Sequence, residues 1–204
     1  MAPRLNEWAS MAAHAYGLYS GINAAIAAAP DKSASIVHHA DEFRMMSALL
    51  CIVRVFATID RASIVSLQSV NRFLKSDSAL SCVAAAYAGT DDAAKIDVAS
   101  GTCGRSIQRF KTEYARIDWS VLGRLQSFRN SAIAHIRWSE VDRFVTFGEL
   151  EALVEIVGRL AGETSLMTSG LNNWPHEHQE SAHENAKHKW SAIFTADHLD
   201  RIDY

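Results

Sequence analysis

Apolar residues recur in steps of three and four along most of the chain, a spacing typical of helices that bury one face. The first such run extends from Leu5 to Ile26. It precedes Pro30, which disfavours helical geometry at the residue before it, so we expect the first helix to end there. Gly17 and Gly21 within this run either allow a neighbouring helix to approach closely or only weaken the helix locally.

A second helix, whose apolar stripe runs over residues 36–60, has the most regular spacing of three and four in the sequence. Asp31 or Ser33 is able to cap its start, because both side chains accept hydrogen bonds from backbone amides. Arg54 lies beside the stripe of this helix, and Asp60 falls where the helix is expected to end, as a cap or an ion-pair partner. The stripe consists of Ile36, His39, Phe43, Met46, Leu50, Val53, Ala57 and Asp60.

The middle of the chain contains two shorter helical segments, at 66–75 and 76–88. Residues 89–104 are predicted to form a loop, because they are rich in glycine and small polar residues. The pattern then predicts one long helix from Arg105 to Ile136. Together with the first two helices, these segments indicate an all-α protein.

The last part of the chain begins with a capping-box pattern, Thr146 to Glu149, at the start of another amphipathic helix. The composition changes near residue 169, so we divide the chain into a helical bundle over 1–168 and a polar tail over 169–204. The tail is predicted to be partly helical and to pack on the bundle or on a partner. Its histidines do not share one face of a helix and are weak metal ligands. They are His176, His178, His183 and His188.

Composition limits the possible functions. Of the 204 residues 49% are apolar, enough for one well-buried domain, alone or with an appendage. The net charge of −3 means that any contact with nucleic acid must be local. Cys51, Cys82 and Cys103 lack zinc spacing and are interpreted as thiols in a reducing compartment, so no metal and no cofactor is expected. Because no apolar run is long enough to cross a membrane and no secretory signal is recognisable, a cytoplasmic protein without membrane contact is expected.

The candidate chemistry lies in the heptapeptide from Arg129 to His135. Arg129 is permanently charged and is able to hold a phosphate through two hydrogen bonds, while His135 titrates near neutral pH and is able to transfer a proton. Asn130 beside the arginine and Ala134 before the histidine make the motif more specific than its bare spacing, which occurs by chance about once in such a chain. The motif favours RNA cleavage over the alternative of a solvated arginine and an ordinary helix histidine.

A straight helix does not bring the two ends of the motif together. At about 100° per residue, His135 falls on one border of the apolar stripe and Arg129 on the other, about 9 Å apart along the axis. Either the helix is distorted near the motif, or two copies of the chain combine their motifs across a dimer interface.

The residues around the motif are basic within an acidic protein. Arg105, Arg109 and Arg116 lie opposite the stripe, a position that suits a solvated face as well as an RNA contact. The candidates for RNA contact nearer to the motif are Arg124, Ser131 and Arg137.

A helical bundle whose late helix carries Arg129-Asn130 and Ala134-His135 resembles the HEPN superfamily, the higher-eukaryote and prokaryote nucleotide-binding domains of prokaryotic defence and toxin systems. It is similar in particular to the AbiU-type abortive-infection group. In that group an Arg-containing apolar helix ends at an Asp and leads into Ser-Leu, as residues 54–67 do here, and a Thr-x-x-Glu-Leu helix start follows the motif, as at 146–150. The resemblance covers residues 33–166. The chain departs from the group by having Asn130, Ser131 and Ile136 where Asp, Lys and a polar residue are frequent.

The resemblance implies an up-and-down bundle of four to six helices with a C-terminal helical tail. It also implies a metal-independent endoribonuclease that acts as a homodimer with a composite active site, in phage defence or as a toxin. His135 would be the general acid or base, Arg129 would stabilise the scissile phosphate, and Asn130 would orient the histidine or a phosphate oxygen. Arg54 and Asp60 are candidate supporting residues. RNA, a second copy and an antitoxin protein are the expected partners.

Two alternatives come from other classes of protein. Many HEPN proteins have lost catalysis, so the chain is alternatively a silent bundle that binds a nucleotide or a partner protein. A plain helical interaction domain with an accidental motif is the third interpretation.

Overall fold

The structure is a computed structural model that describes the chain apart from residues 30–32, 61–63, 131–144, 172–173 and 203–204. Within the described residues it contains eight helices and no strand. The all-α class predicted from the sequence is therefore confirmed.

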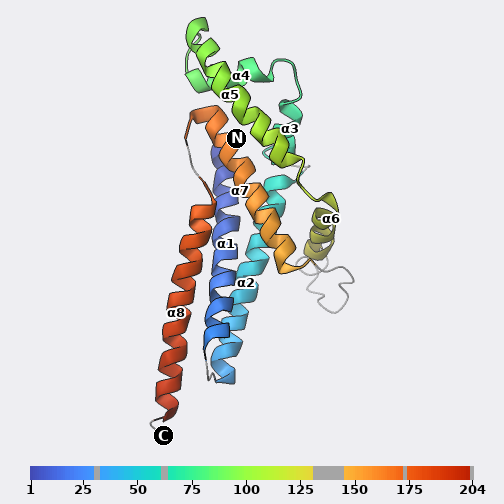
Figure 1. Ribbon diagram of the computed structural model, residues 1–204. Coiled ribbons are helices and arrows are strands. Elements are labelled where there is room, and N and C mark those ends of the chain that lie inside the picture. Colours follow the sequence, from blue (N-terminus) through green and yellow to red (C-terminus); the bar gives the residue numbers. More distant parts are fainter. Residues whose placement is uncertain (30–32, 61–63, 131–144, 172–173, 203–204) are drawn as a thin grey trace.

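Four long helices form the body of the molecule (Figure 1). They are α1 (Ala2–Ala28), α2 (Ala34–Ile59), α7 (Phe147–Ser169) and α8 (His176–Ile202). α1 and α2 run antiparallel, and α8 lies along α1 (Figure 1) and also contacts α2. α7 packs across the N-terminal half of α1, so that α1 has helices on three sides.

Four shorter helices lie around one end and one side of this body (Figure 1). They are α3 (Leu67–Phe73), α4 (Ala79–Ala88), α5 (Ala93–Tyr114) and α6 (Trp119–Phe128). α4 and α5 pack against each other, and both contact α7. α6 contacts α2, which places the beginning of the heptapeptide beside the body of the molecule.

The central position of α1 follows from its small side chains. The helix is buried on most of its circumference, as expected of a helix that is apolar all round. Its buried apolar residues are Ala2, Leu5, Ala9, Ala12, Ala13, Ala15, Tyr16, Tyr19, Ile22 and Ala25. Alanine and glycine allow neighbouring backbones to come close, and this explains how one helix accommodates three partners.

The two glycines of α1 mark the closest approach. A Cβ atom built at Gly17 would lie 2.2 Å from the backbone oxygen of Gln179, and one at Gly21 would lie 2.3 Å from the backbone oxygen of His183. Of the two interpretations of these glycines, close approach of a neighbouring helix is therefore confirmed. Ala182 of α8, which is buried, completes the contact.

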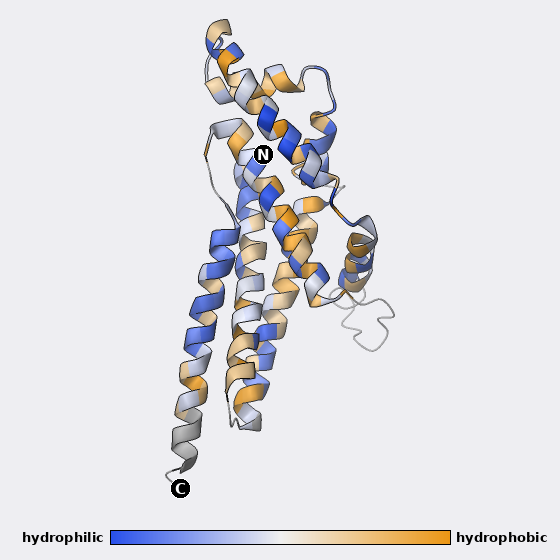
Figure 2. Ribbon diagram, viewed as in Figure 1, coloured by the Kyte–Doolittle hydropathy of each residue, from blue (hydrophilic) through white to orange (hydrophobic). Residues whose placement is uncertain are grey.

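α8 accounts for most of the region predicted to be a polar tail. Its first half is hydrophilic in Figure 2, next to the more apolar ribbon of α1. Further along α8, Phe194 is buried and Trp190 packs against the same small cluster as Ile22 and Ile36, whereas Ile193 is exposed. The tail histidine His183 has a local partner, because its Nδ1 lies 2.8 Å from the Ser20 hydroxyl oxygen.

The helix signals at the starts of α2 and α7 are confirmed. The Ser33 hydroxyl accepts a hydrogen bond from the Ile36 amide and caps α2. Thr146 and Glu149 form a complete capping box at the start of α7. Asp60 terminates α2, where its amide donates to the Phe56 carbonyl at 2.8 Å.

The stripe of α2 expected from the periodicity does not face the core. The buried side of α2 is the opposite one, formed by Ala40, Ala48, Cys51, Ile52, Val55, Phe56 and Ile59. The stripe residues Phe43, Met46, Leu50 and Val53 are exposed instead. α2 is apolar on two faces, and α1 packs against the face that has the smaller side chains at Ala40 and Ala48.

Two predictions for the middle of the chain are wrong. Residues 89–104 are not a loop, because α5 begins at Ala93, where the Asp92 carboxylate caps it by accepting from the Ala94 amide at 3.0 Å. The long helix predicted from Arg105 is interrupted after Tyr114. A new helix then starts at Trp119, and Asp118 caps it.

Replacing Gly21 with alanine tests the close contact between α1 and α8. The new methyl group would meet backbone rather than a movable side chain, so we expect Gly21→Ala to lower the free energy of unfolding by about 1–3 kcal/mol. Gly101→Ala is the matched control, because that helical glycine has open space around it, and the change should raise stability by up to about 1 kcal/mol. Urea denaturation measures both, and equal stabilisation by the two changes would contradict the close approach.

Candidate functional site

Arg129 lies directly after α6, where Arg129 and Asn130 form a π-helical turn. Its guanidinium carbon is 4.1 Å from the centroid of the Phe56 ring on α2, a cation–π distance. Its Nε and Nη2 atoms donate hydrogen bonds of 3.2 and 2.9 Å to Oδ1 of Asn130. The side chain is thus held on one face by a ring and on one edge by an amide.

The charge of Arg129 is not neutralised by a carboxylate among the residues that the structure describes. Arg129 is half-buried and Asn130 is exposed. A guanidinium that is oriented and unpaired is suited to binding a phosphate oxygen. The π-helical turn also bears on the sequence alternatives, since it is a helix distortion at the start of the motif.

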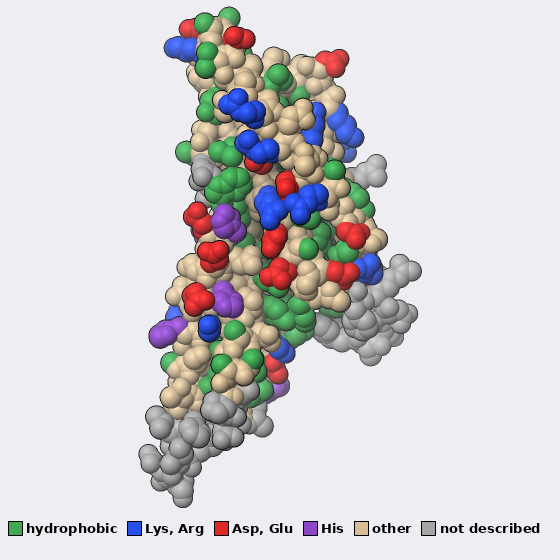
Figure 3. All heavy atoms as spheres, viewed as in Figure 1, with side chains coloured by type: hydrophobic (Ala, Val, Ile, Leu, Met, Phe, Trp, Pro, Cys, Tyr) green, Lys and Arg blue, Asp and Glu red, His purple; other side chains and the backbone are tan. Residues whose placement is uncertain are grey.

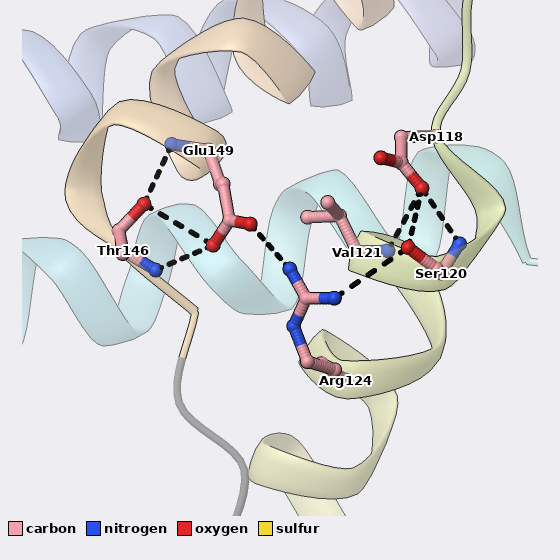
Figure 4. Close-up of polar contacts among 6 residues, drawn as sticks. All are labelled: Asp118, Ser120, Val121, Arg124, Thr146 and Glu149. Atoms are coloured by element: carbon pink, nitrogen blue, oxygen red, sulfur yellow. Dashed lines mark hydrogen bonds and ion pairs between the residues drawn. The ribbon is translucent and has the colours of Figure 1, made fainter.

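Arg124, a predicted RNA-contact residue, takes part in an ion pair within the protein. It forms an ion pair with Glu149, the capping-box residue of α7, and contacts the hydroxyl of Ser120 (Figure 4). Figure 4 shows that the pair joins α6 to the start of α7. Because its charge is paired, Arg124 positions α6 and is a poorer candidate for RNA contact than Arg129.

Two carboxylates stabilise this junction through hydrogen bonds. The Ser120 hydroxyl and the amides of Ser120 and Val121 donate to Asp118, and these bonds lower the pKa of the Asp118 carboxyl. The Thr146 amide donates to Glu149 at 2.8 Å and lowers the pKa of that carboxyl. The hydrogen bonds at the junction between α6 and α7 therefore favour the ionised form of both carboxylates. Because the junction positions α6, it also determines where Arg129 lies.

Of the two candidate supporting residues, Arg54 does not face Arg129. Arg54 and Phe56 are two positions apart, about 200° around α2, so Arg54 points away from the ring on which Arg129 stacks. Arg54 is half-buried, and its Nε atom has no hydrogen-bond partner among the described residues. Asp60 lies at the end of α2.

The other predicted site residues, Ser131, His135 and Arg137, lie outside the described residues. The geometry of the site therefore rests on Arg129 and Asn130. Phe56 is the functional neighbour that the sequence did not indicate, since it occurs as one apolar residue among many in the run between Arg54 and Asp60.

Of the three arginines predicted to form a basic face, Arg109 and Arg116 pair with glutamates, whereas Arg105 does not pair with one among the described residues. Nε of Arg109 lies 2.7 Å from the buried carboxylate of Glu163, and this hydrogen bond raises the pKa of the arginine. Arg116 pairs with Glu113 at 3.0 Å, and Arg159 of α7 approaches the same Glu113 at 3.7 Å. Figure 3 shows Lys and Arg side chains next to Asp and Glu side chains across the middle of the molecule. This surface offers no uninterrupted track for a phosphate backbone.

Within the described part of the chain, none of the helices has the length and apolar character needed to cross a membrane. Over the same residues, no three side chains of His, Cys, Asp or Glu gather as a possible metal-ligand set. Comparison of the chain with protein-family models, curated proteins and solved structures found no match.

The junction between α6 and α7 should weaken in acid. Because the pKa of Glu149 is lowered in the folded state, its contribution to stability is present above the ordinary glutamate pKa of about 4 and is lost as pH falls through the lower folded value. We expect Glu149→Gln to destabilise the protein at pH 6, and the difference from wild type to shrink towards pH 3. Urea denaturation at several pH values measures this difference.

Glu155→Gln serves as the control, because Glu155 makes only an exposed ion pair with Arg159 on the same helix. Its effect should stay within about 0.5 kcal/mol at every pH. A Glu149→Gln effect that was equally small, or that did not depend on pH, would show that the junction does not rely on the ionised carboxylate.

Proposed function

We propose that this protein is a metal-independent endoribonuclease of the HEPN type, acting in phage defence or as a toxin. The observation that carries the proposal is Arg129, which stands at the start of the heptapeptide, stacked on Phe56 and without a carboxylate partner among the described residues. The helical fold is consistent with the proposal, because Arg129 directly follows the short helix α6, which packs against α2 of the bundle.

The hydrogen bonds between Arg129 and Asn130 suggest a role for each residue in binding a phosphate. Oδ1 of Asn130 accepts two bonds from Arg129, which leaves the two N–H donors of the same amide for a second acceptor. Arg129 and Asn130 together therefore present N–H donors to the non-bridging oxygens of one phosphate. Such donors stabilise the negative charge that builds up when the phosphate is attacked.

In the proposed reaction the ribose 2'-hydroxyl attacks the adjacent phosphorus, and the bond to the 5'-oxygen of the next nucleotide breaks. His135 takes the proton from the 2'-hydroxyl or gives one to the leaving 5'-oxygen. The products are a 2',3'-cyclic phosphate and a 5'-hydroxyl. Because one straight helix does not bring Arg129 and His135 to one phosphate, the proposed active site combines residues of two copies.

The same stacked arginine favours a second candidate function, a catalytically silent bundle. An oriented, unpaired guanidinium binds the phosphate of a nucleotide, or a carboxylate of a partner protein, whether or not a proton is transferred. Binding without cleavage by purified protein distinguishes this candidate from the nuclease.

The decisive experiment is RNA cleavage by purified protein in the presence of EDTA. We expect fragments that end in a 2',3'-cyclic phosphate, and a loss of rate of at least about 100-fold in both His135→Ala and Arg129→Ala. Arg129→Lys should lose most of the activity as well, because lysine keeps the charge but neither stacks in the same way nor donates two parallel bonds.

Arg105→Ala is the matched control, since Arg105 is an exposed arginine whose side chain bonds only to Thr102 within the described residues. Its rate should match that of wild type. Undiminished cleavage by both His135→Ala and Arg129→Ala would reject the proposed site, and nucleotide binding without any cleavage would favour the silent bundle.

A further inference from the structure

The outward face of α2 is an exposed apolar strip, defined by Phe43, Met46, Leu50 and Val53. These side chains are 56, 64, 44 and 37% exposed. Scattered exposed apolar residues are normal in proteins, but four large ones that follow one another on one helical face indicate an interaction surface. The strip is about 15 Å long, from the rise of a helix over ten residues.

The sequence pattern of the strip is that of a coiled coil. Its strict steps of three and four extend in both directions, to Ile36 and His39 before it and to Ala57 and Asp60 after it. A core-facing helix usually has a broader apolar stripe, whereas a seam confined to two positions in every seven is typical of one helix packed on another. The core contacts of α2 lie on its opposite side, and Met46, Leu50 and Val53 of the seam remain exposed, while Phe43 contacts Trp190 of α8.

The two ends of the strip carry opposite charge. At the N-terminal end, Glu42 is exposed, and its carboxylate lies 3.4 Å from a ring nitrogen of His38 and of His39. At the C-terminal end, Arg129 covers Phe56. Glu42 and Phe56 are fourteen positions apart and lie on the same flank of the strip.

We propose that a second copy of this chain docks on the strip, with the two α2 helices antiparallel about a two-fold axis between Met46 and Leu50. Phe43 of each copy then packs against Val53 of the other, and Met46 against Leu50. A two-fold axis of this kind sets each flank against the same flank of the second copy. Glu42 of one copy therefore faces the Arg129 end of the other.

The strip is complementary to itself only in this antiparallel arrangement. A parallel pairing would set His39 against His39, whereas the antiparallel one sets His39 against the small Ala57. Trp190, whose ring centroid is 5.8 Å from that of Phe43, widens the surface at one end, and Arg129 widens it at the other. The surface is therefore broader than one helix.

The interface goes beyond the proposed function, because it sets the two copies of Arg129 at opposite ends of the strip, and it does not depend on RNA cleavage. It sets Arg129 of each copy beside His38, His39 and Glu42 of the other, so that each candidate site includes side chains from two copies. The dimer is measured without RNA, and cleavage is measured separately, so the failure of one proposal is distinguishable from the failure of the other.

Sedimentation equilibrium on the full chain tests the interface. We expect wild type to have twice the mass of one chain, and Met46→Glu to raise the dissociation constant at least about 30-fold, the effect of a strongly contributing interface residue. Val98→Glu on α5 is the matched control, because Val98 is also an exposed apolar residue but lies on a different helix from the strip, and it should leave the mass unchanged. Circular dichroism confirms that each variant is folded.

Charge reversal and cross-linking test the antiparallel register. Glu42→Arg should weaken the dimer, and adding Arg129→Glu should restore it. In a Cys82→Ser background, which removes the exposed native thiol, Phe43→Cys protein mixed with Val53→Cys protein should form a disulfide between the copies. Phe43→Cys protein alone should not.

Several outcomes would overturn the proposal. They are a monomeric wild type, a dimer unaffected by Met46→Glu, and cross-linking of Phe43→Cys to itself. A monomer that Met46→Glu destabilises would instead show that another segment of the same chain covers the strip. A Met46→Glu monomer that still cleaves RNA would leave the interface in place and reject the composite active site.

Discussion

The close packing of helices around α1 is the constraint on which the rest of the structure depends. Gly17 and Gly21 allow α8 to lie so near that its backbone oxygens occupy the space of a side chain. The alanines of α1 similarly admit α2 and α7 on its other sides. With α1 filled in this way, α2 has only one face left for the interior, and its second apolar face is turned outward. α7, fixed on α1, then holds α6 through the pair of Glu149 and Arg124, and α6 presents Arg129.

The sequence predicts the helices better than it predicts their orientation. Local signals such as the Ser33 cap, the capping box at Thr146 and the proline after α1 act within a few residues, so they are readable in the chain itself. The orientation of α2 cannot be read from the sequence, because both of its faces are apolar. Packing against α1 determines which face is buried. The periodic apolar stripe from Phe43 to Val53 is present, but its side chains are exposed on the surface of the single chain.

The errors between α4 and α6 have a common physical cause. Glycines and small polar residues predict a loop at 89–104, yet the Asp92 cap and the packing of α5 on α4 and α7 keep this segment helical. The buried Ile117 continues the apolar stripe across the break before α6, which hides the helix start that Asp118 caps. Similarly, the stacking of Arg129 on Phe56 joins residues far apart in sequence, so no local pattern predicts it. The packing of α5 and the position of Arg129 thus depend on contacts between distant segments, which composition and periodicity do not show.

The strongest reason to look for function at Arg129 is that it differs from other arginines of this fold in its partners. Four arginines on or between α5, α6 and α7 each pair with a glutamate, namely Arg109, Arg116, Arg124 and Arg159. Arg129 is half-buried, and among the described residues it has a ring on one side and the amide of its own neighbour on one edge but no carboxylate. Partial burial makes an unpaired charge costly, and the ring recovers only about 0.5–2 kcal/mol of that cost. A cation kept in this state is stabilised further by any anion that binds its outer edge, and a phosphate fits that edge in both charge and shape.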